Sequence, residues 1–248
     1  MDQVFLSDTE LYFTTPDKIA KQDVVIVGEE VKHISQVMRN SIGDEIFVTD
    51  GTGKIFRTSI KHISKGECIA GIIQIFEYSD PLMDFVVCIP RLKNNDKLEL
   101  ALEKCVELGI TNILVFQSSR CIGRGSKIER WNKISIGAIK QSLRSFLPTI
   151  EFLDKFENFN NLSGIKIIFD QSGDILFKDY LSSNSNDNIN ADNKKKYLIF
   201  GPEGGLSEDE INLVKNKKVL KLNNNRLRSE TAVINAASIL SHYFTEVQ

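Results

Sequence analysis

The sequence of 248 residues is long enough for one large or two small domains, and its 42% hydrophobic content is ordinary for a chain that buries a core. The net charge of −2 at pH 7 argues against a protein that coats RNA through general positive charge. No apolar run approaches the ~20 residues of a membrane-spanning helix, and the N-terminus lacks the basic and long apolar regions of a secretion signal. We therefore expect a cytoplasmic protein without a membrane anchor.

The first quarter of the chain is typical of a small β-barrel. Short apolar runs alternate with turn signals, which predicts strands at residues 24–27, 45–49, 55–60 and 68–76. The turn Asp50-Gly-Thr-Gly53 has the glycine pattern of a hairpin. Residues 30–39 carry apolar positions at helical spacing and predict a short helix.

A domain boundary is expected near Pro81, because proline cannot continue a strand ladder and the residues before it are polar. This predicts domains at residues 1–77 and 78–248. In the second domain strands alternate with helices, which predicts an α/β fold with a parallel sheet covered on both faces. The strands are expected at residues 85–89, 113–116, 165–169, 197–200 and 219–222, and the helices at 96–108, 126–143, 175–181 and 230–244, with a further helix starting after Ser207.

The middle of the chain is richer in basic residues than its first part. Residues 91–144 contain eleven basic and five acidic residues, whereas residues 1–76 contain eight and eleven. A phosphate-binding surface should therefore centre on residues 91–144, although solvated helix faces would explain part of the excess of basic residues.

Residues 182–196 are predicted to form a polar, low-complexity loop. The four cysteines stand singly with no CxxC pair, so we expect reduced core thiols and no metal.

Two strand-loop-helix segments near the C-terminus carry the strongest signal. The loop Gly201-Pro-Glu-Gly-Gly205 follows one predicted strand, and the segment Leu222–Ala232 follows the next. The carboxyl ends of such strands form the crevice where open α/β sheets bind ligands, and glycine lets a ligand approach the backbone. The loop is neither a P-loop nor a dinucleotide fingerprint. The capping box Ser207-Glu-Asp-Glu210 starts a helix directly after it. On the glycines alone, a tight turn without a ligand stays an alternative.

Together these segments resemble the RsmE family of SPOUT-class RNA methyltransferases, which makes N3-methyluridine in 16S ribosomal RNA. The resemblance rests on Gly201–Gly205 and on Leu227-Arg-Ser-Glu-Thr-Ala232. It extends to residues 33–39, 43–45 and 50–53, which resemble that family's RNA-binding, PUA-like barrel. The resemblance implies S-adenosylmethionine as cofactor, 16S rRNA of the small ribosomal subunit as partner, no metal, and a homodimer. It also implies a deep trefoil knot, which no periodicity would predict because true knots are nearly absent from proteins.

The resemblance also implies roles for individual residues. Methylating N3 of uridine requires loss of the imide proton and stabilisation of the charge on O2 and O4, so Arg228 is the candidate cation and Glu230 the acidic catalytic candidate. Glu230 lies at a helix N-terminus, where it can instead act as an anchor. The cofactor-binding candidates are Asp170, Phe200, Gly201, Glu203, Gly204, Gly205, Leu222, Asn223 and Leu227. The RNA-binding candidates are Arg39, Arg91, Lys93 and Arg120.

One departure and two alternatives stand beside this interpretation. The family's Gly-Pro-Arg is replaced by Asn223, Asn224 and Asn225, and the following apolar residue by Arg226. Asparagine tolerates the left-handed conformation, so the loop shape can survive. A SpoU-like ribose 2′-O-methyltransferase is one alternative, but no Asn-x-Gly-x-x-x-Arg motif follows Phe85. A non-catalytic RNA-binding assembly factor that has lost the cofactor is the other.

Overall fold

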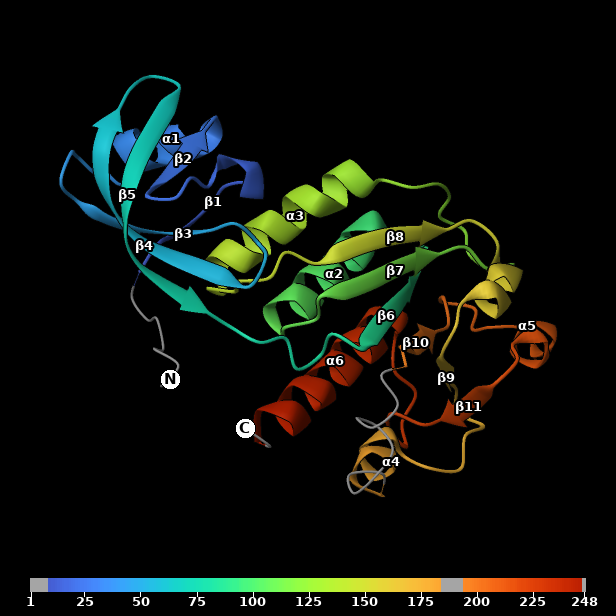
Figure 1. Cartoon of the computed structure of the whole chain (residues 1–248). Coiled ribbons are helices and arrows are strands. Elements are labelled where there is room, and N and C mark those ends of the chain that lie inside the picture. Colours follow the sequence, from blue (N-terminus) through green and yellow to red (C-terminus); the bar gives the residue numbers. More distant parts are fainter. Residues whose placement is uncertain (1–8, 184–193, 247–248) are drawn as a thin grey trace. The chain divides into compact units, whose positions relative to one another are not determined.

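The computed structural model describes residues 9–183 and 194–246, which form two compact units (Figure 1). The first comprises the described residues up to Asp80 together with Ile136–Leu147, and the second comprises Pro81–Ser135 and the described residues from Pro148 onward. The division predicted between residues 77 and 78 stays a prediction, and the sequence pattern gave no sign that Ile136–Leu147 packs with the first unit. None of the described helices is both long and apolar enough to span a membrane.

The first unit is built on a five-stranded sheet in the order β1-β3-β4-β5-β2. Its strands are β1 (Leu11–Phe13), β2 (Asp23–Val27), β3 (Glu45–Thr49), β4 (Lys54–Ile63) and β5 (Glu67–Glu77). The hairpin strands β3, β4 and β5 are antiparallel, as predicted, while β1 runs parallel to β3. The three residues of β1 are too few for alternation to be visible in the sequence, so this strand was not predicted.

The predicted barrel is observed as a curled sheet with β1 and β2 as its edges (Figure 1). The Thr14 hydroxyl donates to the Val25 carbonyl oxygen at 2.7 Å and links these two edges. A 3-10 turn, η1 (Pro16–Lys18), connects them along the chain. The predicted helix is α1 (Glu29–Lys32), continued by the π-helical turn η2 (His33–Val37). Its Val31 and Ile34 pack into the core of the unit.

The segment Ile136–Leu147 attaches to the turn between β3 and β4. Ser145 accepts a hydrogen bond from the Gly53 amide at 2.9 Å and another from the Thr49 hydroxyl at 3.2 Å. Gly53 has a φ of 97°, and a Cβ there would collide with the Phe146 ring, so only glycine fits. The predicted hairpin glycine therefore also serves a contact far away in the sequence.

The second unit contains a six-stranded sheet in the order β11-β9-β10-β6-β7-β8, parallel throughout. Its strands are β6 (Phe85–Pro90), β7 (Asn112–Phe116), β8 (Thr149–Leu153), β9 (Ile165–Phe169), β10 (Lys196–Phe200) and β11 (Lys217–Leu220). Strands β6, β7 and β8 follow one another towards one edge of the sheet, and β9, β10 and β11 form the other half. The strand order thus reverses between β6 and β10, which is where α/β sheets bind ligands.

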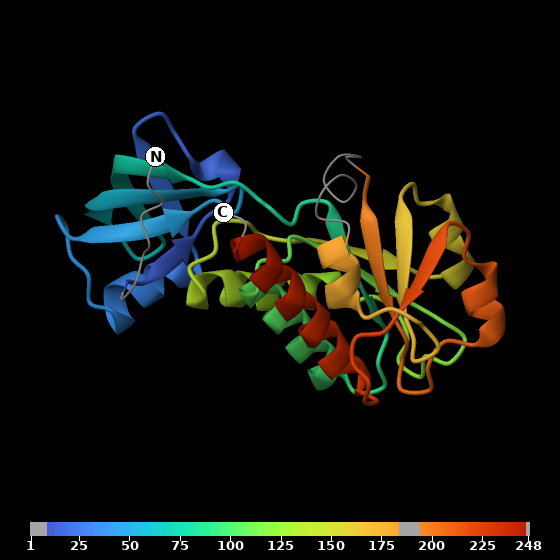
Figure 2. The same ribbon diagram turned by 90° about the horizontal axis from the view of Figure 1, so that it is seen from below.

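Both faces of this sheet are covered, as predicted. The helices are α2 (Asn95–Glu107), α3 (Ile128–Gln141, whose last residues belong to the first unit), α4 (Phe177–Ser183), α5 (Glu208–Leu213) and α6 (Ser229–Glu246), with a 3-10 turn η3 (Phe156–Asn161). Helix α6 runs beside α2 (Figure 2) and contacts β6 and β10. Cys88 of β6 packs in a hydrophobic cluster with Phe156 and Phe159 of η3. The ring of Phe85, also in β6, packs against the ring of Phe244 in α6, with 5.3 Å between the ring centroids.

The structure corrects two details of the expected elements. The strand β8 and the turn η3 were not predicted, although residues 149–152 alternate between polar and apolar. The predicted polar loop at 182–196 begins within α4 and ends at β10, and its central residues, 184–193, lie outside the described residues. Within α6, the side chains of Val233, Ala236, Ala237 and Leu240 are buried.

Candidate active site

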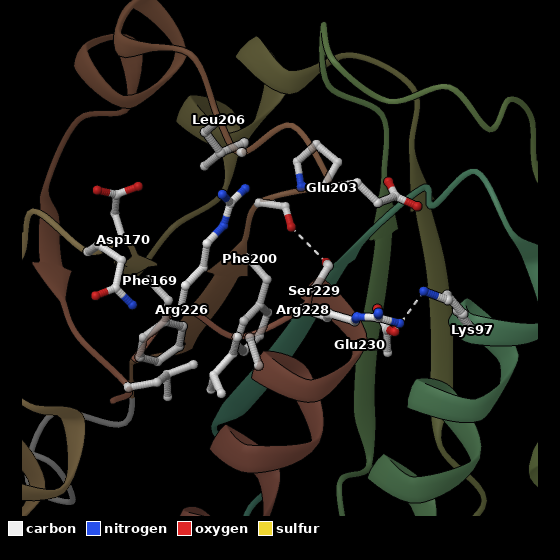
Figure 3. A pocket seen from close by; sticks show the side chains of 17 residues that line it. Lys97, Phe169, Asp170, Phe200, Glu203, Leu206, Arg226, Arg228, Ser229 and Glu230 are labelled. Carbon is white, nitrogen blue, oxygen red and sulfur yellow. Dashed lines mark hydrogen bonds and ion pairs between the residues drawn. The ribbon is translucent and has the colours of Figure 1, made fainter. Parts of the chain in front are cut away.

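A pocket of about 490 Å³ opens in the second unit where β9 and β10 end and α6 begins (Figure 3). The two predicted loops form most of its wall. It is lined by Lys97, Phe169, Asp170, Gln171, Phe200, Gly201, Pro202, Glu203, Gly205, Leu206, Leu222, Arg226, Leu227, Arg228, Ser229, Glu230 and Ala232. This volume lies in the usual range for sites that enclose small molecules or cofactors.

The first loop, residues 201–206, owes its shape to glycine. The Gly205 amide donates to the Pro202 carbonyl oxygen at 2.8 Å and closes a tight turn, and Gly205 has a φ of 70° that disfavours other residues. A Cβ on Gly201 would lie 3.0 Å from the Gly205 Cα. The backbone therefore folds back on itself with no room for side chains on the inner side.

Neighbouring elements hold the first loop from outside. The Arg120 guanidinium donates to the Gly204 carbonyl oxygen at 2.8 Å, and the Glu203 carboxylate accepts from the Lys93 amide at 3.1 Å. The predicted capping box is present: Ser207 and Glu210 exchange side chain-backbone hydrogen bonds. The other Glu210 oxygen accepts from the Ser119 amide at 2.7 Å. The loop is thus tied to the segments that follow β6 and β7.

The second loop, residues 221–229, is fixed by side chains. The Ser229 hydroxyl donates to the Gly201 carbonyl oxygen at 2.7 Å, so the two motifs meet directly, as predicted (Figure 3). The Gln171 amide group donates to the carbonyl oxygens of Asn225 at 3.2 Å and Asn223 at 3.4 Å. The Asn225 amide donates to the Asn223 side-chain oxygen at 3.1 Å. None of the three asparagines has a positive φ, so the loop does not need the left-handed conformation that asparagine tolerates.

One side of the pocket is apolar. The rings of Phe169 and Phe200, which end the neighbouring strands β9 and β10, stack at 4.9 Å between centroids. Leu206, Leu222 and Leu227 add aliphatic surface to the lining. A flat aromatic group such as a nucleobase would exclude water from these surfaces on binding.

Charged groups gather around the start of α6. The Lys97 ammonium lies 3.0 Å from a Glu230 carboxylate oxygen, and Glu230 is only 8% exposed (Figure 3). Burial by itself would raise the pKa of the Glu230 carboxyl. The Glu230 backbone amide, the hydrogen bond and charge of Lys97, and the charge of Arg228 outweigh burial, so the pKa lies below its ordinary value. Glu230 is therefore an anion at neutral pH.

The structure brings together most of the residues assigned from sequence. All the catalytic and cofactor-binding candidates line the pocket except Gly204 and Asn223. Gly204 instead uses its carbonyl oxygen to hold Arg120, and Asn223 caps the Asn225 amide. The roles of all these residues stay predictions. Residues that sequence reasoning missed are Lys97, Phe169, Gln171, Pro202, Leu206, Arg226, Ser229 and Ala232. Several lie within the quoted motifs, whereas nothing in the sequence pointed to Lys97.

The RNA-binding candidates lie in different surroundings, and their RNA contacts stay predictions. Arg91 is only 2% exposed, and its guanidinium donates to the Gly125 carbonyl oxygen and the Asn95 side chain. Arg120 holds the first loop. Lys93 is exposed beside that loop, and Arg39 is exposed in the first unit with a positive φ of 60°. Arg91 and Arg120 thus hold loops of the protein in place, a role that their positive charge alone did not indicate.

Two family models together, and several known proteins, match most of this chain. The sequence model described as "RNA methyltransferase domain" matches residues 79–241, and that described as "RNA methyltransferase PUA domain" matches residues 26–73. "Ribosomal RNA small subunit methyltransferase E" of Rickettsia conorii is 31% identical over 215 residues, covering 83% of this chain and 84% of the relative. The enzyme of that name from Bacillus subtilis is 29% identical over 238 residues, covering 90% of each chain.

A solved structure shares the fold. The crystal structure of ribosomal RNA small subunit methyltransferase E from Neisseria gonorrhoeae, bound to S-adenosyl methionine, superposes with a TM-score of 0.80. It is 23% identical, and the match covers 94% of this chain and 97% of that one. Among the described residues, no group of three or more histidine, cysteine, aspartate or glutamate side chains is arranged to hold a metal ion.

Proposed function

Since this chain belongs to the family of ribosomal RNA small subunit methyltransferases E, we propose that it transfers a methyl group from S-adenosylmethionine to N3 of a uridine in the decoding region of 16S rRNA. The observation that supports the proposal is one pocket lined by both motif loops, which the hydrogen bond between Ser229 and Gly201 joins. The position of the uridine and the N3 atom come from the family resemblance described above.

The residues of the pocket fit S-adenosylmethionine. The Gly201 backbone leaves no room for a Cβ, the apolar side offers surface for the adenine ring, and one Glu230 oxygen is buried without a partner among the described residues. Phe200, Leu222 and Leu227 would contact the adenine, and the backbone of the first loop would contact the rest of the cofactor. When bound, S-adenosylmethionine supplies an activated methyl group, so the transfer needs no metal ion.

Arg228 and Glu230 take the roles that the uridine chemistry requires. The imide proton of uridine leaves more readily when a cation stabilises the charge that develops on O2 and O4, and Arg228 is an exposed cation of the pocket lining whose charge acts on Glu230. Glu230 is a weak proton acceptor because its pKa is lowered. It therefore acts by binding and orientation, and the N3 proton passes to solvent.

The loops beside the pocket supply the surface for RNA. Lys93 and Arg124 are exposed on the segments that follow β6 and β7, and the bond from Arg91 to Gly125 holds these segments together. Within the described residues neither exposed cation forms an ion pair, so both are available to phosphates. In the first unit, Arg39 lies in the segment that resembles the PUA-like RNA-binding domain. We assign these residues to phosphate contacts and Arg91 and Arg120 to support.

The resemblance also leads us to propose the trefoil knot. The chain after β11 runs against the segment after β9: the Lys221 amide donates to the Ile175 carbonyl oxygen at 2.9 Å, and the Phe177 amide donates to Lys221 at 2.7 Å. These contacts support a threaded arrangement of the two segments. Single-molecule stretching from the two chain ends tests it, since a knotted chain stays shorter than its full contour length after unfolding. Extension to the full contour would contradict the knot.

We propose a homodimer on the same basis. Within the described residues, Leu100 on α2, which runs beside α6, is 44% exposed. A second copy packed on this helix would cover the leucine. Sedimentation equilibrium should give twice the chain mass of 28.0 kDa, and a single-chain mass at micromolar concentration would remove the dimer.

The function is tested by primer extension on 16S rRNA from cells with and without the protein, with a plasmid-borne copy as control. An N3-methyl group removes the Watson–Crick donor of uridine, so it should stop reverse transcriptase at one position. The stop should vanish without the protein and return with the plasmid. A stop that persists without the protein would refute the assignment, and ribose methylation in its place would favour the SpoU-like alternative. Absence of heat on titration with S-adenosylmethionine would favour the non-catalytic factor.

A further inference from the structure

The ion pair between Lys97 and Glu230 joins two elements that are far apart in the sequence. Lys97 lies in the first turn of α2, and Glu230 in the first turn of α6. Lys97 contacts only one carboxylate oxygen of Glu230, at 3.0 Å. The other, Oε2, is buried and has no hydrogen-bond partner among the described residues, although Glu230 lines the pocket. A buried carboxylate oxygen without a donor is costly, so a missing donor is expected at this point.

We propose that Lys97 is a positioning residue: it holds Glu230 as an anion at the pocket wall, so that Oε2 accepts a hydrogen bond from an N–H or O–H group of the bound ligand. The inference rests on the proposed function for the identity of this pocket as the reaction site. Lys97 itself would not contact the reacting atoms.

Two charged groups act on Glu230 from the elements around it, Lys97 from α2 and Arg228 from the preceding loop. Without Lys97, burial would still oppose ionisation, and one of the two nearby cations would be lost. The pKa of Glu230 should then rise, because the hydrogen bond and the charge of Lys97 no longer favour the anion. A protonated Glu230 would lose its attraction for Arg228 and offer a weaker acceptor to the ligand.

The first experiment needs no catalysis. In the full chain with ¹³C-labelled glutamate, the carboxyl carbon of Glu230 is titrated by NMR in the wild type, Lys97→Met and Lys104→Met. Lys104 lies on the same helix and pairs with Glu103 and Glu107 outside the pocket lining, so it is a matched control. The Glu230 pKa should rise in Lys97→Met and stay unchanged in Lys104→Met. An unchanged pKa in Lys97→Met would overturn the proposal.

The second experiment separates positioning from simple bracing of the two helices. At neutral pH, kcat/KM of Lys97→Met should fall about tenfold to a hundredfold, as expected for a misplaced contact group. The acid limb of its pH–rate profile should move to higher pH, and Lys97→Arg should restore both. The double variant Lys97→Met/Glu230→Gln should be no worse than Glu230→Gln, since both act through one contact. Additive losses, or an acid limb that does not move, would show a bracing role only.

Failure of this inference can be told from failure of the proposed function. If wild-type protein methylates no 16S rRNA, the proposed function falls, while the NMR titration still decides whether Lys97 controls the ionisation of Glu230. If wild-type protein is active and Lys97→Met matches it across the pH range, only the role of Lys97 is lost.

Discussion

The two loops of the pocket keep their shapes by different means. The first, residues 201–206, depends on glycine backbone geometry and on contacts that Arg120 and Lys93 make from outside. The second, residues 221–229, contains no glycine and is held by side chain-to-backbone hydrogen bonds from Gln171 and Ser229. The first loop therefore has a fixed shape that leaves backbone N–H and C=O groups accessible to a ligand. The second presents side chains, and it can vary in sequence as long as its anchors remain.

The asparagines of the second loop illustrate this tolerance. Where the family has Gly-Pro-Arg, this chain has Asn223, Asn224 and Asn225, and the Asn223 side chain caps the Asn225 amide. Such local bonds replace the stiffness that proline gives a turn. Arg226, one position after the place of the family's arginine, lines the pocket.

The largest effect should come from Arg228, the side chain of the second loop that we propose lies beside the base. Arg228→Ala should lower kcat by about a hundredfold to a thousandfold, because a positioned cation stabilises the charge that forms on the uracil oxygens. Cofactor affinity should change little. Arg226→Ala removes an equal charge from the same loop and should cost less than about tenfold, because no contact with the uracil oxygens is proposed for Arg226. Single-turnover methylation of 16S rRNA compares the two, and equal losses would contradict a specific role for Arg228.

A smaller effect is expected from changing the backbone of the first loop. In Gly201→Ala the new Cβ would lie 3.0 Å from the Gly205 Cα and 3.1 Å from the Leu206 amide nitrogen, so the backbone must shift. Such overpacking costs about 1–3 kcal/mol, which would weaken cofactor binding by roughly tenfold to a hundredfold. In Gly204→Ala the Cβ would meet only the Arg120 side chain, at 3.5 Å. Calorimetric titration with S-adenosylmethionine should find near wild-type affinity in this control.

The bond that joins the loops should matter less than either loop alone. Ser229→Ala removes the hydroxyl that donates to the Gly201 carbonyl oxygen. A hydrogen bond of this kind contributes about 1 kcal/mol, so cofactor affinity should fall by about fivefold. Ser229→Thr keeps the hydroxyl and should retain binding. If Ser229→Thr binds S-adenosylmethionine as weakly as Ser229→Ala, the hydroxyl is not what joins the two loops.

The weakest effect is expected at the anchor of the second loop. Gln171 is exposed, and its bonds to the Asn223 and Asn225 carbonyl oxygens are long, at 3.4 and 3.2 Å. Gln171→Ala should therefore lower kcat/KM by less than about threefold. Steady-state kinetics would detect a larger change. A tenfold loss of kcat/KM would mean that the shape of the second loop matters as much as that of the first.

Much of this protein follows from local sequence. The apolar runs predicted most strands, Ser207 and Glu210 predicted the start of α5, and the two motifs predicted the loops that meet in the pocket. These features depend on residues a few positions apart, where backbone geometry and capping act. Sequence alone could therefore indicate the parallel sheet and the site at its carboxyl edge.

Only the tertiary structure decided which charged groups meet. The basic middle of the chain suggested a phosphate surface, yet Arg91 is buried, Arg120 supports the first loop, and Lys97 pairs with Glu230 across more than a hundred residues of chain. The packing of Ile136–Leu147 with the first unit is equally invisible in the sequence. Charge and periodicity describe one residue and its neighbours along the chain. The partner of a charged group is chosen by how the sheet and helices fold together, and that partner determines whether the group braces the protein or serves the site.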